Sequence, residues 1–88
     1  MNSPWAGAAD ILRQKLAVLE PLQLDIRDDS LQHAGHAGSR EGGHFALHIV
    51  SSRFIGLSIV QRHRLVYDAV GNLQQVGVHA LSIDARTP

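Results

Sequence analysis

Cysteine is absent from this chain of 88 residues. Without a thiol, the chain alone can form neither a disulfide nor a thiolate metal site. It can offer only imidazole and carboxylate groups to a soft metal ion or an iron–sulfur cluster. If it contacts such a group, the sulfur ligands must come from a partner.

Long apolar runs and an excess of either charge are also lacking. The longest uninterrupted apolar runs have three or four residues, so no segment is long enough to span a bilayer. The first residues resemble neither a signal peptide nor an Arg-rich transit peptide, and we therefore expect a cytoplasmic protein. Eight Lys and Arg balance eight Asp and Glu, so no net positive field attracts nucleic acid.

The sequence contains no recognisable catalytic motif. It has no nucleophile motif, no paired carboxylates at a useful spacing and no glycine loop of the phosphate-binding type. We therefore expect a protein that is not an enzyme. Six histidines are the chemically most informative side chains that remain.

The length and composition are typical of one small folded domain. With 44% hydrophobic and 18% charged residues, the chain is neither disordered nor membrane-like. We expect a single domain over residues 1–88, which at this length is just large enough for one core.

The first third of the chain predicts a helix followed by a strand. Ser3 suits an N-cap and Pro4 the first helical position. Apolar residues then recur at spacings of three and four, as one helix face requires, at Trp5, Ala8, Leu12, Leu16 and Leu19. Pro21 ends the helix, and Leu22, Leu24 and Ile26 alternate with polar residues as in a strand that is buried on one face.

A glycine-rich loop and a second strand come next. Residues 29–43 show no periodicity, and long loops of this kind in a compact domain are usually functional. Phe45, Leu47 and Ile49 then alternate with Ala46, His48 and Val50. Because one loop joins the two strands, we expect them to pair antiparallel.

The last part of the chain predicts helix and then strand. Apolar residues in the range 57–73 fit a helical stripe at Val60, Val66, Tyr67, Val70 and Leu73, with residues 57–60 as a separate short turn. In residues 78–85, alternation places His79 with Leu81 and Ile83 on the face toward the core. The order αββααβ indicates an α+β two-layer sandwich with helices on one face of a three-stranded sheet.

The histidines allow two interpretations. His33, His36 and His44 lie in or beside the glycine-rich loop, which can bring their imidazoles toward His79 to bind a metal. The alternative is a solvated loop and a hydrogen-bonded structural His79. We interpret His48 as structural.

A basic group around the second helix forms another candidate site. Arg62, His63 and Arg64 are consecutive, and Arg53 precedes them near the turn from strand to helix. Their N–H donors suit phosphate, carboxylate or glutathione, or a contact with a partner or a nucleic acid. The alternative is a solvated helix face.

Four segments together resemble the BolA family: Phe54-Ile55-Gly56, the run Gln61 to Val66, Val78-His79-Ala80-Leu81, and Thr87-Pro88. The resemblance covers roughly the last three quarters of the chain. It implies the same element order, in a topology similar to that of class II KH domains.

The resemblance also implies a function. Proteins of this family pair with monothiol glutaredoxins, and the pair binds a [2Fe–2S] cluster in which the glutaredoxin and glutathione supply sulfur and the BolA protein supplies histidine. The family histidine corresponds to His79, and the loop ligand to His33 first, with His36 and His44 as alternatives. Two imidazoles on one iron are a Rieske-like pattern, which raises the cluster potential.

Two further expectations follow from the resemblance and the composition. We expect the free protein to be a monomer. Some family members are associated with transcriptional control, so the alternative function is a KH-like regulator that binds DNA. Against it, the chain has no Gly-x-x-Gly loop, no net positive charge and few aromatic residues for base stacking.

Overall fold

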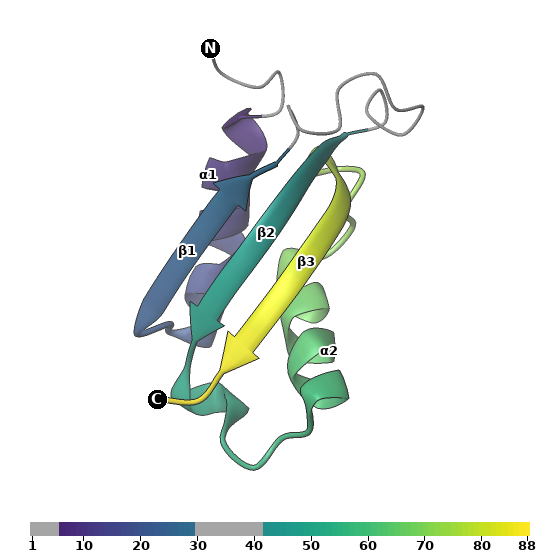
Figure 1. Cartoon of the computed structure of the whole chain (residues 1–88). Coiled ribbons are helices and arrows are strands. Elements are labelled where there is room, and N and C mark those ends of the chain that lie inside the picture. The colour runs from purple at the N-terminus through teal and green to yellow at the C-terminus, as the bar shows by residue number, and fades with distance from the viewer. Residues whose placement is uncertain (1–5, 30–41) are drawn as a thin grey trace.

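The computed structural model describes residues 6–29 and 42–88 of the chain. In order, its elements are α1 (Ala6–Leu16), a 3-10 turn (Ala17–Leu19), β1 (Gln23–Asp28), β2 (Gly43–Val50), a 3-10 turn (Ser52–Phe54), α2 (Ile59–Val70) and β3 (Val78–Arg86) (Figure 1). Ser3, Pro4 and Trp5, and most of the predicted loop at 29–43, lie outside the described residues. Gly43, the last residue of that predicted loop, already belongs to β2.

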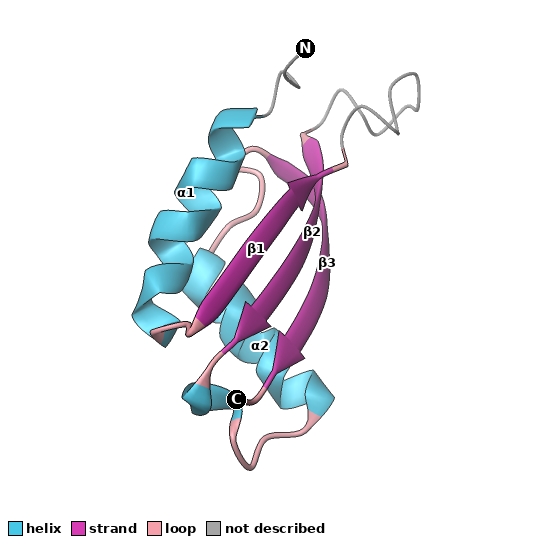
Figure 2. Ribbon diagram, turned by 60° about the vertical axis from the view of Figure 1, so that its left-hand side comes forward, coloured by secondary structure: helices cyan, strands magenta, loops and turns pink. Residues whose placement is uncertain are grey.

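The three strands form one mixed sheet in the order β1-β2-β3. β1 runs antiparallel to β2, as predicted, whereas β3 runs parallel to β2. A parallel neighbour requires a crossover connection, and α2 lies in that connection. Both helices lie on the same face of the sheet (Figure 2), so the α+β two-layer prediction is confirmed.

The central strand carries the middle of the core. Phe45, Leu47 and Ile49 are buried beneath the helices, while His44, Ala46, His48 and Val50 alternate with them and are half-buried. The alternation predicted for this strand is therefore correct. It leaves one face of the sheet without a helix, and this helix-free face carries mainly polar side chains.

α1 packs on the sheet through the predicted stripe. Ala8, Leu12 and Leu16 are buried, and Leu19 continues the stripe in the 3-10 turn. The chain then turns at Glu20, with φ 51°, before Pro21. Leu22 is 70% exposed and precedes β1, so the buried face of this strand consists of Leu24 and Ile26 only.

α2 begins later than predicted and is rotated relative to the predicted stripe. Ser58 caps it: its Oγ accepts from the Gln61 N–H at 3.2 Å, and its own N–H donates to Gln61 Oε1 at 2.9 Å. The short turn precedes the helix at Ser52–Phe54 and not at residues 57–60, so the second of the three helices in the αββααβ order is a 3-10 turn. Val60 and Tyr67, placed on the apolar stripe, are 66% and 40% exposed, whereas Val66 and Val70 are buried as predicted.

Candidate functional site

Two histidines meet where β2 and β3 begin. Because these strands are parallel, their first residues lie at the same end of the sheet. His44 is the second residue of β2 and His79 the second residue of β3. Their ring centroids are 5.2 Å apart, and the ring planes are inclined by 51°. The half-buried imidazole of His44 therefore lies beside the exposed imidazole of His79.

His79 is the extra residue of a β-bulge. Gly43 pairs with Val78, but the next residue of β2, His44, pairs with Ala80. A bulge of this kind redirects a side chain, and here it lets both Val78 and Leu81 face the core although they are three residues apart. The prediction that His79 faces the core with Leu81 and Ile83 was therefore wrong, and His79 is exposed.

The segment before β3 is held by backbone hydrogen bonds. The N–H of Gly43 donates to the carbonyl of Gly77 at 2.9 Å, and the N–H of Val78 donates to the carbonyl of Leu73, also at 2.9 Å. Gly77 has φ 82°, a conformation that favours glycine. The bulge thus has partners both in β2 and in the connection after α2.

The spacing of the two rings can be compared with that of two imidazoles on one metal ion. Two imidazoles that bind one tetrahedral ion through nitrogens about 2.1 Å away have ring centroids about 5 Å apart. The observed 5.2 Å matches this separation. Across residues 6–29 and 42–88, no three His, Asp or Glu side chains converge as a complete metal site. The pair therefore offers part of a coordination sphere.

Two of the four predicted ligands cannot be placed. His33 and His36 lie outside the described residues, so their assignment stays a prediction. Of the histidines that the structure describes, His44 is the one beside His79. In the sequence it was only an alternative to His33.

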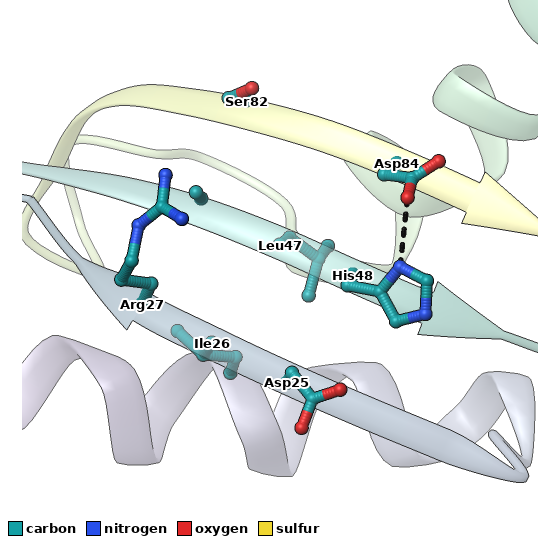
Figure 3. Close-up of a pocket in the computed structure, with 8 residues that line it drawn as sticks. Asp25, Ile26, Arg27, Leu47, His48, Ser82 and Asp84 are labelled. Atoms are coloured by element: carbon teal, nitrogen blue, oxygen red, sulfur yellow. Dashed lines mark hydrogen bonds and ion pairs between the residues drawn. The ribbon is translucent and has the colours of Figure 1, made fainter.

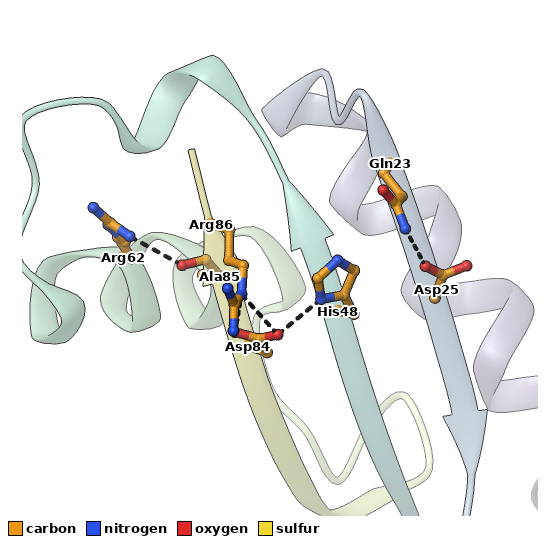
Figure 4. A network of polar contacts seen from close by, with 7 residues as sticks. All are labelled: Gln23, Asp25, His48, Arg62, Asp84, Ala85 and Arg86. Atoms are coloured by element: carbon orange, nitrogen blue, oxygen red, sulfur yellow. Dashed lines mark hydrogen bonds and ion pairs between the residues drawn. The ribbon is translucent and has the colours of Figure 1, made fainter. Parts of the chain in front are cut away.

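The helix-free face carries a second polar group. His48 lies between Asp25 of β1 and Asp84 of β3 in the strand register. Its Nδ1 is 2.8 Å from Asp84 Oδ2, and Asp84 also accepts from Arg86 Nε at 3.0 Å (Figures 3 and 4). Residues of all three strands line a hollow of about 350 Å³ here: Asp25, Ile26, Arg27, Ala46, Leu47, His48, Ser82 and Asp84.

These contacts favour the ionised form of Asp84. The hydrogen bond with His48, and next that with Arg86, lower the pKa of the Asp84 carboxyl below its ordinary value. The sequence did not single out this group, because the partners are 36 residues apart and only the register of the parallel strands brings them together. The structural interpretation of His48 agrees with its contact to Asp84.

The predicted basic group lies at the opposite end of the sheet from the histidine pair. Arg53 follows the end of β2, and Arg62 Nη1 donates to the carbonyl of Ala85 at the end of β3 at 3.2 Å (Figure 4). A strand rises about 3.3 Å per residue, so six residues of β2 separate the two ends by about 20 Å. The basic group and the histidine pair therefore form separate sites.

Two of these arginines have partners within the chain. Arg62 Nε also donates to the carbonyl of Leu57 at 3.0 Å, so Arg62 joins the start of α2 to the end of β3. Arg53 forms an ion pair with Glu20. Arg64 is exposed and His63 half-buried. Contact of these four residues with a partner or a nucleic acid stays a prediction.

Comparison with known proteins identifies the family. A family model described as "BolA-like protein" matches residues 15–88. The chain belongs to the BolA family. It is 48% identical over 84 residues to SufE-like protein 1, chloroplastic/mitochondrial, and 47% identical over 85 residues to protein BOLA1, chloroplastic, both from Arabidopsis thaliana. It is also 47% identical over 89 residues to BolA-like protein 1 of Mus musculus.

These relatives are longer than this chain. The matches cover 88%, 91% and 99% of this chain but 23%, 53% and 64% of the three relatives, in the same order.

Solved BolA structures also match the fold. BolA1 from Arabidopsis thaliana has a TM-score of 0.76 at 44% identity and covers 92% of both chains. The BolA domain of SufE1 from the same plant has a TM-score of 0.74 at 51% identity over 88% of this chain and 87% of that one.

None of the helices in the described part of the chain is long and apolar enough to cross a membrane. This agrees with the short apolar runs of the sequence.

Proposed function

We propose that this BolA protein acts without catalysis as an adapter that binds a monothiol glutaredoxin and shares a [2Fe–2S] cluster with it. The observation that supports the proposal best is the separation of 5.2 Å between the His44 and His79 ring centroids. His79 is the residue that the family resemblance assigns to the cluster. His44 is the described histidine whose ring lies beside it.

The chemistry of the chain agrees with a shared site. With no cysteine, the chain cannot supply the sulfur that iron–sulfur clusters need. Two imidazoles would complete the coordination of one iron, and the family resemblance implies that the thiolates of the glutaredoxin and of glutathione hold the other. A cluster with two imidazoles on one iron has a raised reduction potential, which suits transfer or sensing.

The exposure of His79 supports docking of a partner. His79 is exposed and lies at an end of the sheet, where a second protein can approach without displacing the core. The bulge fixes the backbone at His79 through bonds to neighbouring segments, so little ordering of this backbone is needed when a complex forms.

We place the cytoplasm first as the location, although two relatives carry chloroplastic or mitochondrial names.

Reconstitution tests the proposal. The chain is mixed with a monothiol glutaredoxin, glutathione, iron and sulfide without oxygen, and the products are separated by gel filtration. We expect a one-to-one complex whose visible absorption and circular dichroism differ from those of the glutaredoxin homodimer. Separate elution with an unchanged glutaredoxin spectrum would refute the proposal.

The alternative of nucleic-acid binding has weaker support. Arg62 donates to two backbone carbonyls and Arg53 is paired with Glu20, so part of the predicted basic surface already serves the fold. The described residues add no observation that favours nucleic acid over a protein partner.

A further inference from the structure

Gly42 lies against the backbone of the His79 bulge. A Cβ atom built at Gly42 would be 2.8 Å from the His79 nitrogen, 3.0 Å from the Val78 carbonyl carbon and 3.1 Å from the Gly77 oxygen. Gly42 is buried and has φ 149°. All three neighbouring atoms belong to the backbone, so no side-chain rotation can make room for a larger residue.

The position of this contact links it to the histidine pair. Gly42 is two residues before His44. The backbone atoms nearest to a Cβ built at Gly42 belong to Gly77, Val78 and His79. Its neighbour Gly43 donates to the carbonyl of Gly77 and pairs with Val78. The strand that carries His44 and the segment that carries His79 therefore approach each other closely at Gly42 and Gly43.

We infer that Gly42 is a positioning residue: it lets the bulge close onto β2 and so sets the direction of the His79 imidazole relative to His44. A methyl group at position 42 forces residues 77–79 away from β2. Because the backbone nitrogen of His79 is one of the displaced atoms, its ring then moves relative to that of His44. A role of Gly42 in cluster binding rests on the proposed function.

The first test uses the free protein and therefore does not depend on the partner. We would compare nuclear Overhauser effects between the ring protons of His44 and His79 in the unaltered chain and in Gly42→Ala. We expect these effects in the unaltered chain and their loss or marked weakening in the variant, with far-UV circular dichroism retained. Equal ring-to-ring effects in both proteins would overturn the inference.

Gly71→Ala is the matched control. Gly71 also has a positive φ, 79°, but an added Cβ would meet no atom within 4 Å, and the residue is the C-cap of α2. This variant should have a lower melting temperature and unchanged effects between the two rings. If both variants lose those effects equally, general destabilisation explains the result and the inference is wrong.

A second variant keeps the test decisive if Gly42→Ala does not fold. Gly77→Ala strains the same segment through its φ of 82° and should also weaken the contact between the rings. A folded Gly77→Ala with unaltered ring-to-ring effects would count against the inference.

The second test uses the complex with glutaredoxin. Gly42→Ala should shift the visible circular dichroism of the mixed cluster, or lower its yield, while Gly71→Ala should not. If even the unaltered chain forms no mixed complex, the proposed function fails, but the comparison of ring contacts in the free proteins still decides the role of Gly42. A mixed cluster with the same spectrum and yield in Gly42→Ala would contradict the positioning role.

Discussion

His44 and His79 lie on neighbouring parallel strands with their ring centroids 5.2 Å apart, and His79 is the extra residue of a β-bulge. This relationship joins two residues that are 35 positions apart in the sequence and places them at one end of the sheet.

The first prediction compares two histidines of β2. His44 and His48 are both half-buried on the helix-free side of the strand, but only His44 lies beside His79. In the reconstituted complex, His44→Ala should shift or abolish the visible spectrum of the mixed cluster, and His48→Ala should leave it unchanged. If His33→Ala or His36→Ala abolishes the spectrum while His44→Ala does not, the second ligand comes from residues 30–41.

The second prediction concerns a buried hydroxyl that joins three segments. Ser51 Oγ donates to the Leu19 carbonyl at 2.6 Å and accepts from the Arg53 N–H at 3.0 Å, and the side chain is fully buried. Ser51→Ala should lower the free energy of unfolding by about 1–3 kcal/mol, because the Leu19 carbonyl and the Arg53 N–H both lose their partner. Urea denaturation measures this change, and Ser52→Ala, at an exposed position, should change stability by less than about 0.5 kcal/mol.

The third prediction separates two arginines of α2. Arg62 is half-buried and donates to the carbonyls of Leu57 and Ala85, whereas Arg64 is exposed. Arg62→Ala should therefore lower the free energy of unfolding by about 1–2 kcal/mol. Arg64→Ala should leave the free energy of unfolding nearly unchanged.

The same arginines test the alternative function. If the chain binds DNA through this surface, Arg64→Ala should weaken binding without affecting the fold and reduce its dependence on salt. The absence of any salt-dependent binding to DNA by the unaltered chain would dismiss that function.

The fourth prediction concerns the pH dependence of stability. His48 and Arg86 hold the pKa of Asp84 below its ordinary value, so the folded state favours the ionised carboxyl. The resulting stabilisation is present above the unfolded pKa of about 4 and is lost as the pH falls through the lower folded pKa.

The corresponding measurement is denaturation as a function of pH. Asp84→Asn should reduce the stability of the chain slightly at neutral pH, and the difference from the unaltered chain should shrink below about pH 4. Asp68→Asn, at an exposed position of α2, is the control. A difference between Asp84→Asn and the unaltered chain that is constant across this range would contradict the assignment.

The sequence predicted the elements whose side chains follow a regular local period. Phe45, Leu47 and Ile49 alternate without interruption, and the helix stripe of Ala8, Leu12 and Leu16 is complete, so both were assigned to the correct face. Local periodicity is enough there, because each buried side chain repeats along its own element.

The direction of His79 was not predictable by the same reasoning. The prediction extended the alternation of Leu81 and Ile83 back to residue 79 and assumed an unbroken strand. The extra residue of the bulge changes the face on which the residue at position 79 lies. The bulge lies against Gly42, which is 37 residues away and carries no periodic signal.

The buried face of α2 was predicted only in part for a related reason. Val60 and Tyr67 have the spacing of a stripe, yet they are exposed, and Leu65, Val66 and Val70 pack in or against the core instead. Arg62 was assigned to the polar side, but its long side chain reaches two backbone carbonyls. Local spacing does not show which carbonyls a side chain will meet.

The most direct test of the central claim is pulsed electron paramagnetic resonance of the reduced mixed cluster. Only this chain would carry ¹⁵N-histidine, and the glutaredoxin would remain unlabelled. Our account predicts ¹⁵N couplings from imidazoles of this chain, with one coupling lost in His44→Ala and no change in His48→Ala. A cluster that forms with both proteins present but shows no coupling to the labelled histidines would contradict it.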